Sequence, residues 1–538
     1  MIKKLSSLTM ALGFVLVGCN TENEYKKQRV DAANKFIEKI GTKRPDVKRV
    51  YTLQQCIDGA IEHNLDYKVL DLKRRVAAEQ KNAAVLGMLP DLTISNDVQS
   101  RTGTPGSSSE NIRTGEQSLV SSKSTQNTVD TFKAELALST LDFGLAFLNS
   151  TQSSDKLIIS KLTKRRAAQN LELDVVKTYY RVAAAQNAVE VTQDLLVRCR
   201  DIQETLKKVQ DKGEVQILRL IDEQKRFLDL EIRLVSYQRS YRNACLQLTN
   251  LMGYKPTDYI KVDTSMFKKF KAAEFPNIKL LEQVALFKRP ELGQLDVQKN
   301  VTRTESYKTL LMMFPTVRAF ADFTYSSNKF IYTSNWFEIG AKAAYNLLRL
   351  PQQIATYRSQ EIQVEEMEQR ILALSLGIMA QVRIAHANIE EVKERFELNN
   401  RQYLNFNEQA IKSRKLFDKG GNLSRLTLDR LELEAAEAYV DKVISQSNYL
   451  VSCYQLLNAM GIERTNLTDI DTVIKKIKAE EAKIAKIDRE IEDRLINAAK
   501  RNQEIIMTFN GIKLHDTTMP EDERKIFMRA IERSKENQ

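Results

Sequence analysis

The nine residues CLQLTNLMG at 245–253 recur as CYQLLNAMG at 453–461, which is 208 residues further along the chain. A second landmark has the same spacing, because Gly213 is followed by Gly421 after another 208 residues. In both copies 40 residues separate this glycine from the glycine that ends the motif. The chain of 538 residues therefore contains two copies of one structural unit.

Each copy begins with a turn that lies 26 residues before a proline. Asn64-Leu65 precedes Pro90, and Arg289-Pro290 precedes Pro315, so the offset here is 225 residues. The first copy therefore carries 17 more residues between its proline and its turn glycine than the second. They fall within residues 103–128, which are rich in Gly, Ser, Thr and Asn, a composition typical of an exposed loop where extra length is tolerated.

A very long helix is predicted in each copy, over about residues 145–210 and 352–418. No glycine or proline occurs between Gly144 and Gly213, and apolar residues recur there at helical spacing. About seventy residues at 1.5 Å each would extend roughly 100 Å, which is too long for the interior of a compact domain. Each long helix must return through a second helix, so we expect two antiparallel coiled-coil arms.

The segments before each long helix alternate with a period of two, which predicts strands at about 91–101, 131–143, 316–326 and 335–347. In the second of these, Phe132, Ala134, Leu136 and Leu138 alternate with Lys133, Glu135, Ala137 and Ser139. Strands of about ten residues with one apolar face fit the length of a transmembrane β-strand. Four strands cannot close on themselves, and an open edge cannot face lipid, so neighbouring chains must supply more strands. Trp336 and Tyr345 are compatible with an interfacial aromatic girdle. The alternative is a pair of water-soluble hairpins that cap a helical bundle.

The N-terminus predicts export. Lys3 and Lys4 precede an apolar run that ends in Leu-Val-Gly-Cys at 16–19, so residues 1–18 are interpreted as a signal peptide. The last four residues resemble the bacterial lipobox, which implies cleavage before Cys19 and a covalent lipid on its sulfur. Stable attachment requires two or more acyl chains. In the lipoproteins that this segment resembles, Asn20 favours the outer membrane. The alternative is an ordinary secretory signal with a chance cysteine.

Composition argues against several functions. The formal net charge is +12, but basic and acidic residues alternate along the helices, so a solvated surface is expected and nucleic acid is not an expected partner. The three histidines are scattered and the five cysteines lack C-x-x-C spacing, so neither a metal site nor a cofactor is expected. No nucleophile motif or phosphate loop predicts an enzyme.

In their order and duplication, these landmarks resemble the TolC-like outer-membrane efflux proteins over about residues 51–461. The resemblance also rests on Leu89-Pro90 and Phe314-Pro315 before the strands, and on Asp142-Phe143-Gly144 after the first hairpin. It implies a mainly α fold with a small β part: a homotrimer whose twelve-stranded β-barrel lies in the outer membrane and continues as an α-helical barrel across the periplasm. The expected parts are a lipid-anchored segment at 19–50, repeat one at 51–253, a linker at 254–280, repeat two at 281–461 and a charged helical extension at 462–538.

The resemblance places the channel entrance and the docking site of a periplasmic adaptor protein at the helix-hairpin tips, around Gly213 and Gly421. Gly421 with Ser424 resembles the family's Val-Gly-x-x-Ser/Thr tip, but Gly420 stands in place of the Val, and copy one has Gln216 in place of the Ser. The tip glycines also suit ordinary helix-ending turns. The candidate entrance carboxylates are Asp211, Asp418 and Asp429, because a ring of three carboxylates would attract cations. The alternative for them is a set of solvated tip charges.

The leading hypothesis is a passive export channel of a tripartite efflux or type I secretion system, lipid-anchored in the outer membrane and powered by an inner-membrane transporter. The competing hypothesis is a periplasmic coiled-coil lipoprotein scaffold without a pore.

Overall fold

The computed structural model describes residues 22–41, 44–46, 48–118, 120–212, 217–268, 272–420 and 424–462, together with residues 475, 477 and 479. The chain forms two compact units. Within the described residues, the sheet unit covers the chain up to residue 182 together with 239–262 and 289–377, and the tip unit covers 183–238, 263–288 and the residues from 378 onward.

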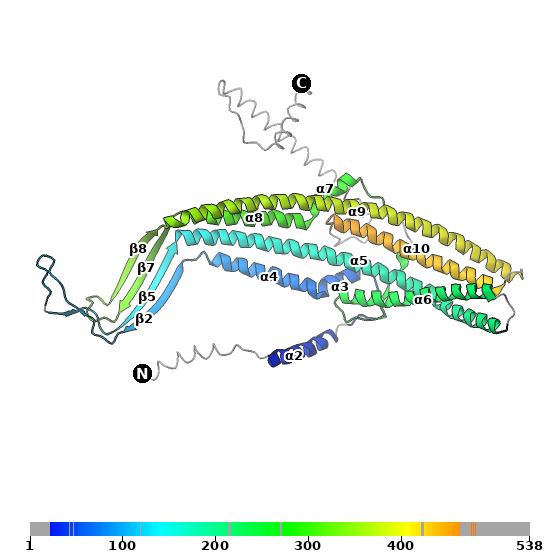
Figure 1. Cartoon of the computed structure of the whole chain (residues 1–538), viewed down its shortest axis with the longest axis horizontal. Helices are drawn as coiled ribbons and strands as arrows, with labels where there is room; N and C mark the ends of the chain where they lie inside the picture. Colours follow the sequence, from blue (N-terminus) through cyan, green and yellow to red (C-terminus); the bar gives the residue numbers. More distant parts are fainter. Residues whose placement is uncertain are drawn as a thin grey trace, which may run out of the picture. The chain divides into compact units, whose positions relative to one another are not determined.

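The two copies of the repeat fold into the same succession of elements (Figure 1). Copy one contains α4 (Leu65–Leu86), β2 (Asp91–Ser100), β5 (Thr128–Ser139), α5 (Thr140–Lys212) and α6 (Ile217–Leu251). Copy two contains α8 (Pro290–Leu311), β7 (Thr316–Ser326), β8 (Asn335–Ala344), α9 (Leu350–Asp418) and α10 (Arg425–Ala459). The predicted strands and the two long helices, of 73 and 69 residues, are confirmed.

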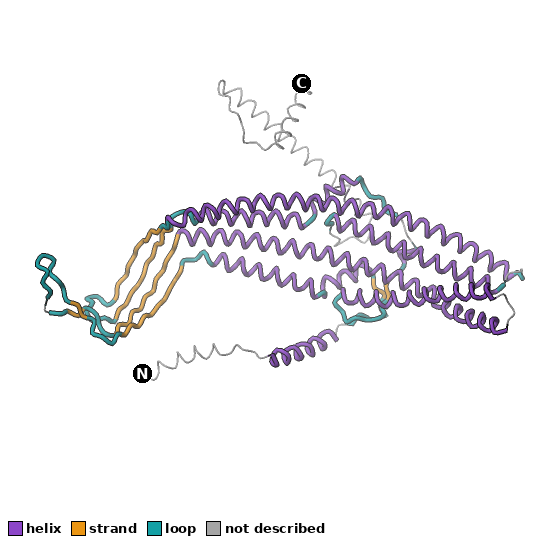
Figure 2. The backbone as a smooth tube through the Cα atoms, in the orientation of Figure 1, coloured by secondary structure: helices purple, strands orange, loops and turns teal. Residues whose placement is uncertain are grey.

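Shorter elements lie before, between and within the repeats. Figure 2 shows that most of the described chain is helix or strand. The shorter elements are α2 (Glu22–Gly41), β1 (Val50–Tyr51), α3 (Leu53–His63), β3 (Gly106–Ser107), β4 (Ser122–Lys123), β6 (Lys261–Val262) and α7 (Ile278–Lys288), with 3-10 turns at Ser265–Phe267 and Leu347–Arg349. The strands β3 and β4 pair within the predicted exposed loop of copy one.

The boundary between β5 and α5 differs from the prediction. The strand was expected to reach residue 143, but it ends at Ser139, whose Oγ accepts a hydrogen bond of 3.3 Å from the backbone N–H of Asp142. Gly144 is therefore helical, and the Leu311 side chain occupies the space that a Cβ at Gly144 would need. A glycine at position 144 therefore allows α5 and α8 to pack closely and does not interrupt the helix.

The duplicated motif is a helix C-terminal cap. Gly253 and Gly461 both have φ of +69°, and the N–H that follows each of them donates to a carbonyl five residues earlier, as in a Schellman motif. At Gly253 a Cβ would lie 2.4 Å from the backbone oxygen of His63. Asn64 caps α4, and its side-chain amide also donates a hydrogen bond of 3.1 Å to the Leu251 carbonyl. The turn at the start of copy one is therefore bonded to the motif at the end of copy one.

The four long strands form one antiparallel sheet in the order β2-β5-β7-β8. In the register, Glu135 of β5 lies opposite Asp322 of β7, and Asp322 lies opposite Glu338 of β8. Within the described residues, no strand pairs with the outer edge of β2 or of β8.

In the two central strands the apolar face is more exposed than the polar face, which is the reverse of a soluble sheet packed on a core. On the apolar face Leu136, Leu138 and Val317 are 48%, 45% and 40% exposed, while the edge strands β2 and β8 are exposed on both faces. On the other face Asp322 is only 3% exposed, and Lys133 Nζ lies 2.8 Å from Glu135 and 3.1 Å from Asp322. Trp336 lies opposite Thr324 on this polar face, so the interpretation of Trp336 as part of an outward aromatic girdle is wrong.

The helices of the sheet unit continue from the ends of the strands and pack side by side. Figure 1 shows α4 beside α5 and α8 beside α9. The pair Lys164–Asp71, at 2.6 Å, joins the first two helices, and Lys299–Glu368, at 3.6 Å, joins the second two. No residue of α4 is fully buried, so one whole side of this helix has no partner in the described chain.

Candidate functional site

The tip unit is built on a hydrophobic core between α5, α6 and α10. The buried residues of this core are Leu195, Leu196, Cys199, Leu206, Phe227, Leu234 and Leu433. The Cys199 thiol donates to the Phe227 carbonyl at 3.2 Å, and burial raises the pKa of this thiol to about 11. The core fixes the returning helix α6 against α5 and brings α10 alongside both.

Ser424 has a clear structural role at the tip of copy two. It is the N-cap of α10, and its Oγ accepts a hydrogen bond of 3.2 Å from the N–H of Thr427. Gly420 follows α9 with φ of +73°, and nothing lies within 4 Å of the place where its Cβ would be. Asp418 is the last residue of α9 and is exposed.

The structure describes less of the remaining predicted tip residues. Gly213, Gln216 and Gly421 lie outside the described residues. Asp211 is the penultimate residue of α5. The predicted arrangement of these residues at the docking tips therefore stays a prediction.

Asp429 belongs to a charge network on α10 that also includes Glu432. Arg198 of α5 reaches both carboxylates, with Nη1 at 3.4 Å from Asp429 and 2.9 Å from Glu432. Arg414 of α9 pairs with Glu432, and Arg425 lies 3.6 Å from Asp429. Three guanidinium groups thus surround two carboxylates and connect three helices.

The network holds Glu432 ionised. Burial by itself would raise the pKa of Glu432, but hydrogen bonds from Arg198 and Arg414 outweigh it, so the pKa lies below its usual value. Asp429 was predicted as an entrance carboxylate, and within one chain it is 8% exposed and paired. Its charge is therefore balanced locally.

Glu432, Arg198 and Arg414 were not predicted as site residues. Part of the signal was present, because Arg425, Asp429 and Glu432 follow one another at spacings of four and three, which places them on one face of a helix. Arg198 is 234 residues from Glu432 in the sequence, and nothing local indicates that contact.

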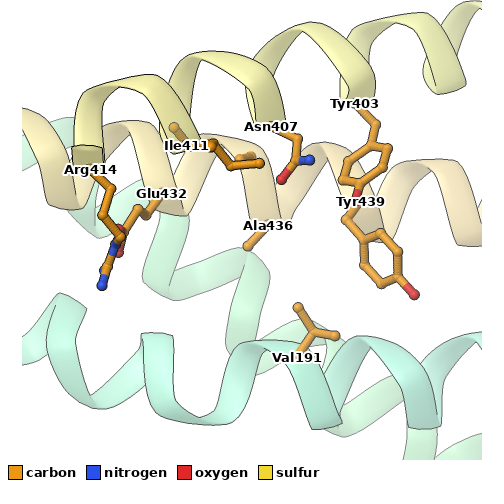
Figure 3. A pocket seen from close by; sticks show the side chains of 10 residues that line it. Val191, Tyr403, Asn407, Ile411, Arg414, Glu432, Ala436 and Tyr439 are labelled. Carbon is orange, nitrogen blue, oxygen red and sulfur yellow. The ribbon is translucent and has the colours of Figure 1, made fainter. Parts of the chain in front are cut away.

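A groove opens beside this network between α5, α9 and α10 (Figure 3). Its cavity of about 410 Å³ is lined by small and apolar side chains, two tyrosines and one ion pair: Val191, Tyr403, Asn407, Ala410, Ile411, Arg414, Glu432, Ala435, Ala436 and Tyr439. The rings of Tyr403 and Tyr439 lie 5.3 Å apart, and Lys442 lies over the Tyr403 ring at 4.7 Å. Apolar walls with a few polar groups suit the side chains of a partner helix.

A second groove, of about 280 Å³, lies between α6 and α10 and is more charged. Arg430 pairs there with Glu223 at 3.3 Å, and Arg233 pairs with Glu437. Among the residues that the structure describes, no group of three His, Cys, Asp or Glu side chains is placed to hold a metal ion.

Comparison with known proteins identifies what the chain is similar to. Residues 56–254 match the family model described as outer membrane efflux protein. The chain is 23% identical over 282 residues to toxin and drug export protein A of Aggregatibacter actinomycetemcomitans, a match that covers 50% of this chain and 57% of that protein. The match thus spans just over half of the curated relative.

Solved structures share the fold. The Campylobacter jejuni CmeC outer membrane channel superposes with a TM-score of 0.59 at 14% identity, over 79% of this chain and 89% of CmeC. The open state of the Neisseria gonorrhoeae MtrE outer membrane channel gives a TM-score of 0.59 at 16% identity, over 76% and 88% of the two chains. At these identities the likeness concerns the fold alone.

Proposed function

We propose that this chain, whose residues 56–254 belong to the outer membrane efflux protein family, is one subunit of an outer-membrane channel for passive export. Small molecules or proteins would pass through it as the last step of a tripartite efflux or type I secretion system. No chemical step is assigned to the chain. The energy would come from an inner-membrane transporter.

The observation that carries this proposal is the exposure of the sheet. In the central strands β5 and β7 the apolar face is more exposed than the polar face, which in water would leave an apolar patch uncovered. In a membrane barrel the same arrangement is favourable, because apolar side chains meet lipid and polar side chains line a wet lumen. A scaffold in the periplasm gives no reason for this distribution.

The two free edges of the sheet indicate that several copies close the barrel. In β2 and β8 about half of the backbone groups point away from the paired neighbour. Each of them would cost several kcal/mol if it were left unsatisfied in lipid. Pairing β2 of one copy with β8 of the next satisfies both edges, and three copies give twelve strands. We therefore propose a homotrimer.

The helices that continue from these two edges support the same arrangement. Leu65, Val69, Leu72 and Val76 of α4 follow at spacings of four and three, and they are 54%, 49%, 58% and 56% exposed. On α9, which follows β8, Leu372 and Leu376 are 59% and 69% exposed. We propose that the α4 stripe packs on α9 of the adjacent copy below the β2–β8 contact.

The tip unit is the proposed docking region for a periplasmic adaptor. The groove in Figure 3 lies next to the network of Arg198, Arg414, Asp429 and Glu432, so a helix that enters the groove would contact the charges that connect α5, α9 and α10. Binding there could be coupled to separation of these helices and hence to the width of the entrance. Asp211 and Asp418 remain candidate entrance carboxylates.

Attachment through a lipid on Cys19 is part of the proposal, and Cys19 and Asn20 lie outside the described residues. The support is the Leu-Val-Gly-Cys sequence that precedes the first described helix. Replacement of Cys19 by Ser should abolish acylation, which mass spectrometry of the mature protein measures.

The test of the function is conductance. The purified full-length chain should run as a trimer in light scattering and should conduct ions in a planar lipid bilayer. A chain that stays monomeric and dissolves without detergent once the acyl chains are removed would contradict the channel and favour the scaffold.

A further inference from the structure

The one tryptophan of the chain lies on the polar face of the sheet, next to a carboxylate. Trp336 of β8 lies opposite Thr324 in the register and is 36% exposed. Glu338 follows two residues later, so it points to the same face about 7 Å further along the strand. In the proposed barrel this face lines the lumen, so the inference drawn from these two residues rests on the proposed function.

Glu338 carries a charge that no described cation balances. Three carboxylates lie in one row across the sheet, because Glu135 lies opposite Asp322 and Asp322 lies opposite Glu338. Lys133 Nζ bonds to the first two, at 2.8 Å and 3.1 Å, and Arg318 also pairs with Glu135. Glu338 is exposed, and among the described residues it takes part in no salt bridge. Its carboxylate is therefore available to a cation from solution.

The indole ring of Trp336 is available in the same way. The polar face already contains one contact between a cation and a ring, because Lys342 Nζ lies 5.3 Å from the centre of the Phe320 ring. Gly340 lies opposite Phe320 and leaves room for this ring. Within the part of the chain that the structure describes, no cation lies over Trp336, although tryptophan attracts cations more strongly than phenylalanine.

The neighbouring strand of the proposed trimer adds no positive charge. In that trimer β2 of the next copy pairs with β8, and β2 contains no lysine or arginine. Thr93 of β2 lies opposite Glu135, so it points to the polar face. Alternation places Asp91, Ser95 and Asp97 on the same face. The adjacent copy therefore contributes carboxylate and hydroxyl groups to the wall next to β8.

We propose that Trp336 and Glu338 form a binding site for an organic cation that carries an aromatic ring. The ring of the ligand stacks on the indole, and its positive charge pairs with the Glu338 carboxylate. Trp336 is the second residue of β8, and α9 follows the other end of this strand, so the site lies near the end of the barrel furthest from the helices. Exported cations of this class would meet it just before they leave the channel.

The position of Trp336 is tested first. Because the chain has one tryptophan, its intrinsic fluorescence reports on Trp336 alone. With the full-length trimer in vesicles, acrylamide in the water should quench this fluorescence and a brominated lipid should not. The matched control W336F/F337W moves the indole to the next position, on the apolar face, and should show the reverse. Equal quenching of the two proteins by the brominated lipid would overturn the site.

Binding is then measured with N-benzylpyridinium, a permanent aromatic cation that quenches indole fluorescence. Quenching of Trp336 should saturate as the probe is added. Benzyltrimethylammonium should displace the probe, whereas benzyl alcohol, which is neutral, should not. Quenching that rises without saturation, or equal displacement by the two competitors, would overturn the proposal.

Variants at Glu338 test the carboxylate. E338Q should raise the apparent Kd of the probe about fivefold or more, the effect of losing one charge-assisted contact. E338D keeps the charge, and E390Q removes the same charge from the tip unit, so both should bind like the natural sequence. Unchanged binding in E338Q, or equal weakening in E338Q and E338D, would refute the assigned role of the charge.

The same preparations are placed in a planar lipid bilayer, which separates this inference from the proposed function. Conductance without saturable binding of the probe would refute the aromatic-cation site and leave the channel standing. Absence of conductance would instead count against the channel itself.

Discussion

Placing a lysine on the apolar face of the sheet tests the outer-membrane proposal directly. Ile94 is the fourth of ten residues in β2, is 66% exposed, and pairs with Ala134 on the face that carries the other apolar side chains. Its neighbour Thr93 points to the opposite face and pairs with Glu135. The two residues therefore form a matched pair that differs only in the side of the sheet.

If the apolar face contacts lipid, I94K places a charge near the middle of the membrane. Measurements on other barrels put this cost at about 2–4 kcal/mol per chain, or roughly 6–12 kcal/mol for a trimer. T93K places the same side chain in the lumen beside Glu135, where the cost is small. If the sheet were a water-soluble cap, both changes would be exposed and would alter stability by no more than about 0.5 kcal/mol.

The assay is refolding of the trimer from urea into lipid vesicles, with the inserted fraction read from the heat-resistant band on a gel. We expect I94K to shift the insertion equilibrium by about thirtyfold or more for each chain, which corresponds to 2 kcal/mol, and T93K to behave like the natural sequence. Equal insertion of the two variants would refute the assignment of the apolar face to lipid.

Three further outcomes are expected. Gly253→Ala should destabilise the chain by about 2 kcal/mol or more in thermal unfolding, because φ is +69° and the new Cβ would meet the His63 carbonyl. Gly377→Ala, in open space within α9, is the control and should stabilise the chain by about 0.5–1 kcal/mol. Equal changes in stability for the two variants would contradict this. Glu432→Gln should lower the free energy of unfolding by roughly 1–2 kcal/mol, which is less than the loss of a fully buried ion pair because the Arg414 side chain is 57% exposed. The same variant should speed hydrogen exchange in α10, and Glu390→Gln serves as the exposed control. The pKa of Glu432 is lowered in the folded state, so the stabilisation from its ionised form is complete above the unfolded pKa of about 4.3 and is lost as pH falls through the folded pKa. Hydrogen exchange in α10 should therefore rise only in acid, and E432Q should not show this rise.

The elements that the sequence predicted best are those whose pattern repeats over many residues. Period-two alternation identified all four long strands, and the absence of Gly and Pro identified α5. The prediction ended the strand at residue 143 and began the helix at about 145, but the helix already begins at Thr140, and Gly144 within it makes room for the Leu311 side chain. Such a contact between distant segments leaves no trace in a local pattern.

The error at Trp336 had a different origin. Phe337 and Ile339 belong to the apolar face, so strict alternation already assigns Trp336 to the polar face. The prediction was based on residue type and distance from the strand end, and the pleat of the strand was not applied. The charge network was not predicted for a third reason: Arg198 and Arg414 reach Glu432 only after three separate helices have packed.

The two copies of the repeat correspond in their long elements and differ in their loops. The helices and strands of the two copies correspond, so the proposed trimer would have six similar hairpins in its wall. The main difference in length lies in the β2–β5 loop, where the Ser124 carbonyl accepts a hydrogen bond of 3.2 Å from Asn328 in the β7–β8 loop. Likewise Ser424 caps α10, while copy one has Gln216 at the corresponding position. Both loops therefore distinguish one copy from the other, and an adaptor that recognises the Ser424 cap would find three equivalent sites in the proposed trimer instead of six.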